Sequence, residues 1–333
     1  MKKGFIALLF CFLFSWSLFS QSNQTFLEFE NQMRDYMDLM YDAPTDNERF
    51  NANEKLMLIF EEVLSMEKSF AYPFEQLSRI SNLKSSDNFF RIFTWAIVSQ
   101  DGSFESFGFV QAKNAQTDEY EVYKLTDKSD EIFNPELAKC DNNTWFGAVY
   151  YELITTKYDD RTFYTLLGFD ANNIYTKRRV IEPISFKSRS GKPEFGASYF
   201  YKDRDRRRYV FEYNAEARFV LKWDNQYYED KSKKNKSSSK NSLFKKRQRQ
   251  TTPAVIPVVQ EQMIVYEVLK PMYESVEGME GMSQFYVPSE QINGFKFERG
   301  RWRFIERVLA RNSDKEKKYK PAQKKTVPLY NSQ

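Results

Sequence analysis

Hydrophobic and polar residues alternate along the middle of the chain, between Trp145 and Trp223. Aromatic and β-branched residues recur at every second position, and short clusters of turn-forming residues interrupt the runs. This alternation is typical of β-strands with one buried and one solvated face. The turns are too short to hold a crossover helix, so neighbouring strands should be antiparallel. The pattern predicts strands near residues 145–156, 161–169, 174–187, 195–201, 207–213 and 216–223.

Similar alternation continues on both sides of this block. Residues 89–113 form a predicted hairpin around Asp101-Gly102, a dipeptide that favours tight hairpin turns. A further strand is expected at 119–125. Gly300 is expected in the turn of the final hairpin, and the last strands are predicted in QMIVYEVLKPM, SQFYVPS, INGFKFER and RWRFIERVL.

The N-terminal part has a helical period instead. Apolar residues recur at three- and four-residue steps in two stretches, 26–41 and 47–67, which Pro44 separates. The expected buried faces are Phe26, Phe29, Met33, Tyr36 or Met37, and Met40 in the first helix, and Leu56, Ile59, Phe60, Val63 and Leu64 in the second. Residues 74–80 are expected to add one more helical turn. We expect this pair to pack on the β part, with a protein-binding helical hairpin as the alternative.

Together these patterns predict an α+β protein, in which an N-terminal helical pair packs on a large antiparallel β-sheet system in sandwich or open-barrel form. We assign residues 21–312 to a single domain, with a helical part at 21–82 and an antiparallel β part at 89–312. Aromatic residues make up 17% of the chain, which is enough ring surface to build a substantial core.

The first 20 residues predict export. Lys2 and Lys3 precede a dense apolar run that is too short for a convincing membrane span. We interpret 1–20 as a signal peptide with Ser20 at the cleavage position, and an uncleaved anchor is the alternative. Bulky Phe10 precedes Cys11, which argues against a lipid-modified cysteine.

The positive net charge of +4 belongs to the ends of the chain and to one internal segment. Residues 231–250 are rich in Lys, Ser and Asn and are expected to form a solvated loop inserted between strands, and 313–333 a flexible charged tail. Without these segments the remaining domain is net negative. Contact with an anionic surface is assigned to the nine cations of the loop: Lys231, Lys233, Lys234, Lys236, Lys240, Lys245, Lys246, Arg247 and Arg249.

That anionic surface is expected to be a membrane or the phosphates of lipopolysaccharide, and plain solvation of the loop is the alternative. Nucleic acid is a poorer fit, because the loop holds a single aromatic residue, Phe244, and so lacks a stacking platform. An exported protein also meets little nucleic acid.

The absence of histidine excludes several chemistries. It removes Ser-His-Asp and Cys-His nucleophiles and His-ligated zinc, and Cys140 is the one cysteine left after the leader. Neither standard nucleotide-binding motif is present. We therefore predict no cofactor, no metal and no catalytic residue. Carboxylate chemistry survives the exclusion, and its candidates are Asp159, Asp160, Asp170, Glu182, Glu194, Glu212 and Glu216.

One turn among these candidates has a second interpretation. Asp170-Ala171-Asn172-Asn173 could begin a calcium loop, but it lacks the glycine and the closing glutamate of an EF-hand. A polar turn is the simpler prediction.

Several segments resemble a family of functionally uncharacterised exported proteins of Bacteroidota. They are RIFTWAIVSQDGSF, YTLLGFDANN, TKRRVIEPISF, GKPEFG, FEYNAEARFVLKWD, MIVYEVLKP, QFYVPS and GFKFERGRWRF, in residues 85–225 and 260–312. The chain departs from that family in its Lys/Ser insertion and in Gly168-Phe169-Asp170-Ala171, where Gly-Trp-Asp-Gly is usual. The resemblance implies that the protein is exported, and it implies no catalytic activity or ligand.

From elimination and compartment we expect a non-catalytic protein of the cell envelope, periplasmic or outer-membrane-associated. It is expected to act through protein–protein contacts, as an accessory subunit of an envelope assembly. The alternative function is a secreted carboxylate-based glycoside hydrolase or a glycan-binding protein.

Overall fold

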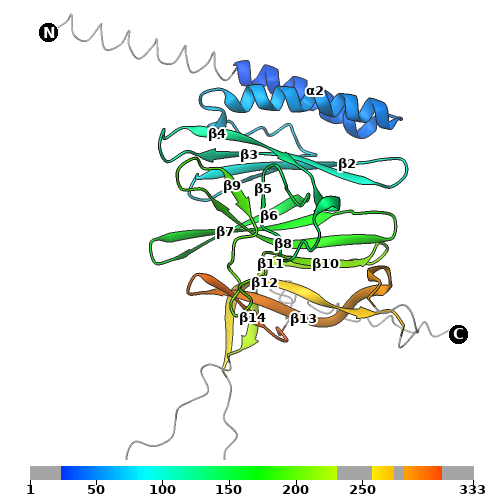
Figure 1. Ribbon diagram of the computed structural model, residues 1–333, viewed down its shortest axis with the longest axis vertical. Helices are drawn as coiled ribbons and strands as arrows, with labels where there is room; N and C mark the ends of the chain where they lie inside the picture. The colour runs from blue at the N-terminus through cyan, green and yellow to red at the C-terminus, as the bar shows by residue number, and fades with distance from the viewer. Residues whose placement is uncertain (1–23, 231–256, 274–280, 310–333) are drawn as a thin grey trace, which may run out of the picture.

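The computed structural model describes residues 24–230, 257–273 and 281–309. Two N-terminal helices and three antiparallel sheets lie one above another as four layers (Figure 1). The predicted α+β class is therefore confirmed, and the β part takes the sandwich form with a third sheet added. The predicted signal peptide (1–20), the basic loop (231–250) and the tail (313–333) lie outside the described residues.

The helical layer consists of a first helix, described over residues 24–42, and α2 (Asp46–Ser65). Thr45 caps α2: its Oγ1 accepts a hydrogen bond from the Glu48 backbone N–H at 3.3 Å and donates one to Glu48 Oε2 at 2.8 Å. The predicted apolar faces are buried, with Phe60 stacked on Trp95 and Phe109 of the sheet below. A short 3₁₀ helix, η1 (Ser69–Ala71), follows α2.

The first sheet has the order β1-β2-β3-β4. Its strands are β1 (Ser81–Lys84), β2 (Phe90–Val98), β3 (Phe104–Lys113) and β4 (Tyr120–Thr126). In β2 the odd-numbered residues pack under the helices, whereas Phe90 and Ile92 pack against the central sheet. Both faces of β2 are therefore buried, which explains its nearly continuous apolar sequence.

The central sheet has the order β5-β9-β8-β7-β6, and β10 pairs with the other end of β8. Its strands are β5 (Cys140–Asp141), β6 (Val149–Tyr158), β7 (Arg161–Asp170), β8 (Thr176–Phe186), β9 (Pro193–Phe195) and β10 (Tyr209–Asn214). The 3₁₀ helix η2 (Ser129–Glu131) lies in the connection from the first sheet to the central sheet.

The third sheet has the order β11-β12-β13-β14. Its strands are β11 (Leu221–Glu229), β12 (Val258–Pro271), β13 (Tyr286–Glu298) and β14 (Arg301–Ile305), with the 3₁₀ helix η4 (Ser283–Phe285) before β13. Gly300, at φ 75°, makes the predicted last hairpin turn. Residues 199–201 pair with β14 around the Phe200–Trp302 bridge, and Leu309 pairs with Tyr227 of β11.

Three predictions of local structure are wrong. The strand expected at 195–201 is the three-residue β9, after which Gly196, at φ 83°, turns the chain. The strand expected at 216–223 begins at Leu221, and residues 74–80 form turns instead of a helical turn. The unpredicted strand β1 begins at Ser81, inside the part assigned to helices.

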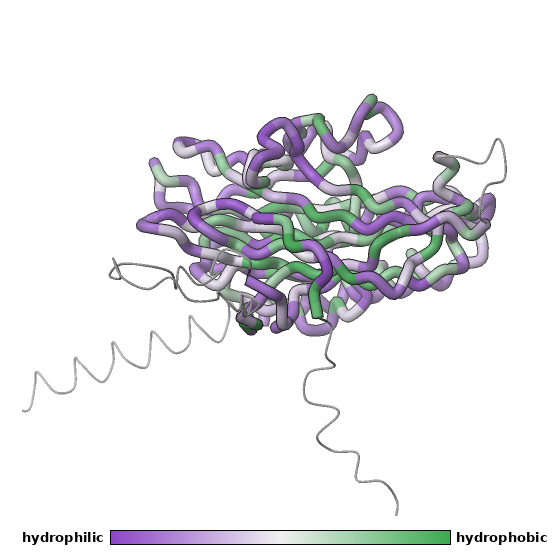
Figure 2. The backbone as a smooth tube through the Cα atoms, turned by 90° about the horizontal axis from the view of Figure 1, so that it is seen from below, coloured by the Kyte–Doolittle hydropathy of each residue, from purple (hydrophilic) through white to green (hydrophobic). Residues whose placement is uncertain are grey.

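Hydrophobic stretches lie along the strands and hydrophilic ones gather at the loops, as Figure 2 shows from below the molecule. Among the described residues, no helix is long and apolar enough to cross a membrane.

Candidate functional site

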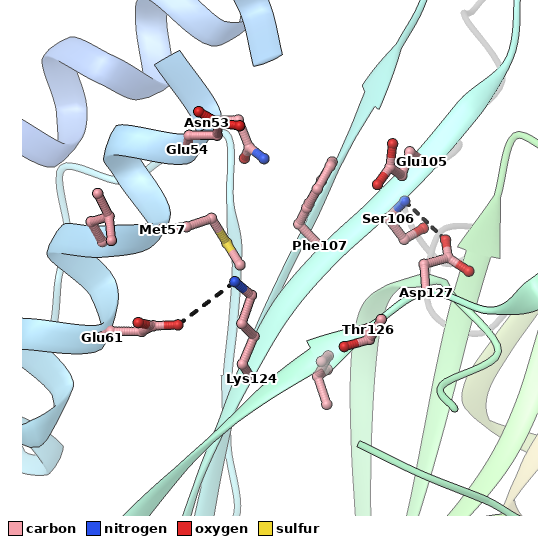
Figure 3. A pocket seen from close by; sticks show the side chains of 12 residues that line it. Asn53, Glu54, Met57, Glu61, Glu105, Ser106, Phe107, Lys124, Thr126 and Asp127 are labelled. Carbon is pink, nitrogen blue, oxygen red and sulfur yellow. Dashed lines mark hydrogen bonds and ion pairs between the residues drawn. The ribbon is translucent and has the colours of Figure 1, made fainter. Parts of the chain in front are cut away.

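A pocket of about 410 Å³ lies between α2 and the β3–β4 side of the first sheet (Figure 3). Its walls come from two layers of the molecule. The lining residues are Asn53, Glu54, Met57, Leu58, Glu61, Glu105, Ser106, Phe107, Lys124, Leu125, Thr126 and Asp127.

The pocket is acidic. Four carboxylates line it, against the single ammonium group of Lys124, which lies 3.7 Å from a Glu61 oxygen. In the described parts of the chain, Glu54, Glu105 and Asp127 have no ion-pair partner. Burial, and then the negative charge of Asp127, raise the pKa of Glu105. Lys124 offsets only one of the four carboxylates, so the lining keeps a net negative charge.

Apolar groups form the rest of the pocket. Met57 is buried, Phe107 is half-buried, and Leu58 of α2 keeps 66% of its surface exposed. A large exposed leucine beside carboxylates suits an aliphatic chain that ends in a positive charge, as in lysine or arginine. The sequence signal for this wall is the set of helical steps that places Glu54, Leu58 and Glu61 on one side of α2, and our sequence analysis missed it.

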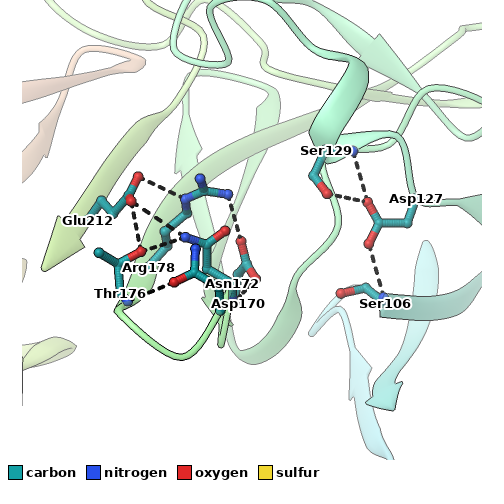
Figure 4. Close-up of polar contacts among 9 residues, drawn as sticks. Ser106, Asp127, Ser129, Asp170, Asn172, Thr176, Arg178 and Glu212 are labelled. Atoms are coloured by element: carbon teal, nitrogen blue, oxygen red, sulfur yellow. Dashed lines mark hydrogen bonds and ion pairs between the residues drawn. The ribbon is translucent and has the colours of Figure 1, made fainter. Parts of the chain in front are cut away.

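Asp127 is held rigidly at one end of the pocket (Figure 4). Its Oδ2 accepts a hydrogen bond from the Ser106 backbone N–H at 3.0 Å, and its Oδ1 accepts from Ser129 N–H and Oγ at 2.9 and 2.7 Å. A Cβ atom on Gly147, at φ 72°, would collide with both carboxylate oxygens. Because three hydrogen bonds fix this carboxylate, it is better suited to positioning a charge than to moving a proton.

A second polar cluster lies around the turn between β7 and β8 (Figure 4). Arg178 bridges Glu212, at 3.0 Å, and Asp170, at 3.3 Å. Asp170 Oδ1 also accepts a hydrogen bond from the Asn172 backbone N–H at 2.7 Å, which closes the turn. This carboxylate therefore stabilises the polar turn that the sequence predicts.

Asp170 has a perturbed pKa in this setting. Burial raises the pKa of its carboxyl to about 6, against the opposing effect of the Arg178 guanidinium. A carboxyl that titrates near neutral pH is a usual mark of a general acid. Asp170 is only 5% exposed, however, and it lines neither this pocket nor the second pocket described below.

Of the seven carboxylates predicted as candidates, Asp170 and Glu212 meet at Arg178, outside the two described pockets. None lines either pocket. Glu182 is fully buried in an ion pair with Arg208 at 2.6 Å, and Glu194 pairs with Lys139 at 3.0 Å. Asp159 and Asp160 form the β6–β7 turn, and Glu216 follows β10.

The Glu182–Arg208 pair belongs to a buried network that joins the 135–140 connection to the central sheet. Tyr150 donates a hydrogen bond to Glu182, and Trp145 Nε1 donates one to the Tyr150 hydroxyl at 2.9 Å. Arg208 also donates to the Ala138 carbonyl oxygen at 3.0 Å and lies 3.3 Å from Cys140 Sγ. The network satisfies its own charges inside the core, which indicates a structural role.

Cys140 is buried in that network, and burial raises the pKa of its thiol. A thiol kept protonated and covered is a poor nucleophile. Across the described ranges, no three acidic or cysteine side chains lie close enough to hold a metal ion.

No family model, curated protein or solved structure matches this chain. The resemblance to exported Bacteroidota proteins therefore stays a prediction. The nine cations assigned to an anionic surface, from Lys231 to Arg249, lie outside the described residues, so their placement is also a prediction.

Proposed function

We propose that the protein is a non-catalytic component of the cell envelope, periplasmic or outer-membrane-associated, that binds another protein as part of an assembly. The contact is the acidic pocket between α2 and the first sheet. The single observation that supports this most directly is that Glu54, Glu105 and Asp127 have no ion-pair partner among the described residues and lie around an exposed apolar surface.

The chemistry of the pocket fits a basic segment of the partner. A lysine or arginine side chain would lay its aliphatic stem against Leu58 and Phe107 and place its charge among the carboxylates. Binding would also relieve the repulsion between Glu105 and Asp127 that raises the pKa of Glu105. Charge complementarity of this kind speeds association and selects the partner.

The alternative of a glycoside hydrolase or glycan-binding protein has less support. A hydrolase needs two carboxylates facing one substrate across a cleft. Asp170 has the raised pKa expected of an acid, but it already bonds to Arg178 and to the chain of its own turn. The carboxylates that line the described acidic pocket include Asp127, which three hydrogen bonds already hold.

Zero-length cross-linking in the native envelope tests the proposal. A carbodiimide joins carboxylates to nearby amines, so a bound lysine-bearing partner should become linked to Glu54, Glu61 or Glu105, and mass spectrometry should locate the link. The variant Glu54→Gln/Glu61→Gln/Glu105→Gln should lose the cross-linked partner. The matched control is Glu75→Gln/Asp160→Asn/Glu216→Gln, which removes three exposed acids elsewhere and should keep it.

Two outcomes count against the proposal in different ways. Equal recovery of the partner with both variants would remove the pocket from the interface. Elution of the protein alone and monomeric, after cross-linking and gentle detergent extraction, would contradict binding of a partner altogether.

A further inference from the structure

Three polar side chains form a row across the first sheet, on the face that the helices cover. Lys84 pairs in register with Arg91, and Arg91 pairs in register with Gln111. Residues directly opposite each other on antiparallel strands share a face, so the three side chains are neighbours. The row lies where α2 has ended and η1 crosses the sheet.

Two positive charges in this row lack counter-charges. Arg91 is only 3% exposed, and its guanidinium donates to the carbonyl oxygens of Tyr72 and Phe70, both at 2.8 Å. Lys84 Nζ donates to the Phe70 carbonyl oxygen at 3.3 Å. In the part of the chain that the structure describes, neither cation has a carboxylate within ion-pair distance. Lys84 is exposed, so the cost of a buried charge without a counter-charge applies to Arg91.

The pKa values of both cations are lowered, as expected for positive charges without a counter-charge. Burial lowers the pKa of Arg91 to about 10, and burial together with the Arg91 charge lowers the pKa of Lys84. Two buried polar atoms of the row, Arg91 Nε and Gln111 Oε1, also have no hydrogen-bond partner. The row is therefore short of an anion and of polar partners.

A pocket of about 640 Å³ opens beside this row. Lys84 and Gln111 line it, and the rings of Phe70 and Tyr120, stacked 3.7 Å apart, form an aromatic wall. Lys84 Nζ lies 4.2 Å from the centre of the Phe70 ring, and the side chain is exposed to solvent. A ligand in the pocket can therefore reach the ammonium group directly, while Arg91 adds positive potential from beneath.

We infer that this pocket binds the carboxylate group of a small organic monoanion, with Lys84 as its direct ionic contact. The aromatic wall packs against the apolar part of the ligand. An N–H or O–H group of the ligand supplies the polar partner that the buried end of the pocket lacks. This inference is independent of the proposed contact with another protein, which uses the middle of α2 and the other end of β4.

The charge of the rim selects a monoanion. Glu67, Lys68, Asp118 and Glu119 also line the pocket, and Asp118 is neutralised by Lys113 at 2.7 Å. Lys68 offsets one of the two remaining acids, so the rim apart from Lys84 keeps one acidic charge, which repels a phosphate dianion more than a carboxylate. Lys84 with Arg91 behind it is sufficient for a single negative charge.

Titration with defined anions tests the inference. The probes are sodium N-acetylglycine, which has a carboxylate and an amide N–H, and inorganic phosphate, both at constant ionic strength. N-acetylglycine should bind saturably to the full-length protein, as followed by calorimetry and by a rise in the thermal unfolding midpoint. Lys84→Gln should weaken this binding by about tenfold or more, the loss expected for one charge-assisted contact.

The control is Lys124→Gln, which removes an exposed lysine from the other pocket of the same sheet and should leave N-acetylglycine binding unchanged. Unaltered affinity in Lys84→Gln would overturn the assignment of the site. Tighter binding of phosphate than of N-acetylglycine would overturn the choice of a monoanion. Failure of any carboxylate to bind saturably at concentrations on the order of 10 mM would overturn the inference as a whole.

Discussion

Asp170 is a buried carboxyl whose ionised form is destabilised by burial more than it is stabilised by Arg178. Its pKa is raised to about 6 from 3.8, mainly by burial, although Arg178 lies 3.3 Å away. The folded state therefore binds a proton between pH 4 and 6 that the unfolded chain does not bind. The free energy of unfolding should fall as the pH rises through this window. Above it, the titration of Asp170 should add no further pH dependence.

The variant Asp170→Asn tests this assignment. It removes the titrating group and keeps an oxygen that can accept the Asn172 N–H. The difference in free energy of unfolding between the wild-type protein and the variant should change by about 2 kcal/mol from pH 4 to pH 7, with the wild type losing more stability. Denaturant titrations at each pH provide the measurement, and parallel pH profiles would show that Asp170 has an ordinary pKa.

Single buried residues are also where the sequence is least informative. The absence of histidine and the isolated Cys140 can be read directly from the chain. Nothing local to Glu182 or Arg208 indicates that they meet, because Glu182 lies on β8 and Arg208 directly precedes β10, so the pairing of these two strands brings them together. Tertiary pairing determines the fate of each charged side chain, and a single sequence does not display it.

At the scale of elements, α2 is held to the first sheet by aromatic contacts. Phe60 is fully buried, with ring centroids 5.1 Å from Trp95, 5.2 Å from Phe93 and 5.4 Å from Phe109. Phe60→Ala should lower the free energy of unfolding by about 3–5 kcal/mol, because it leaves a cavity between two layers. Leu58→Ala, on the exposed side of the same helix, should change it by less than about 0.5 kcal/mol. Equal effects in denaturant titrations would contradict the packing described for α2.

Helices and strands could be predicted from the sequence where their local hydrophobic pattern matches the contacts that they make in the fold. The alternation and the Asp101-Gly102 turn predict β2 and β3, and the two helical stretches predict the first layer. Residues 195–201 show the opposite case. Phe200 is buried and looks like part of a strand, but after β9 the chain turns at Gly196 and pairs with β14 through a single bridge. A strand pairing that depends on a segment about a hundred residues away is not visible locally.

The candidate pockets were not predicted for the same reason. Glu54 comes from α2, Glu105 from β3 and Asp127 from the end of β4, so the acidic pocket exists only once two layers have packed. The Lys84–Arg91–Gln111 row likewise requires three strands in register.

At the scale of the whole molecule, the basic segment and the net negative domain are expected to act separately. Deleting residues 231–249 should leave the thermal unfolding midpoint unchanged, because the apolar strands resume on both sides of this segment. The full chain should bind phosphatidylglycerol vesicles at low salt and lose this binding at high salt, and the deletion should abolish it. A large drop in the midpoint would mean that these residues belong to the core, and undiminished vesicle binding would place the anionic contact elsewhere.

The pairing of residues 199–201 with β14, and of Tyr227 with Leu309, has a consequence for how the protein reaches its native state. Both contacts join positions separated by about eighty residues or more, so they close large loops and bring a high contact order. The third sheet and its contact with residues 199–201 cannot be completed until β14 has been synthesised. Folding should therefore be slow, and it should proceed from the helical end of the stack toward the C-terminal layer.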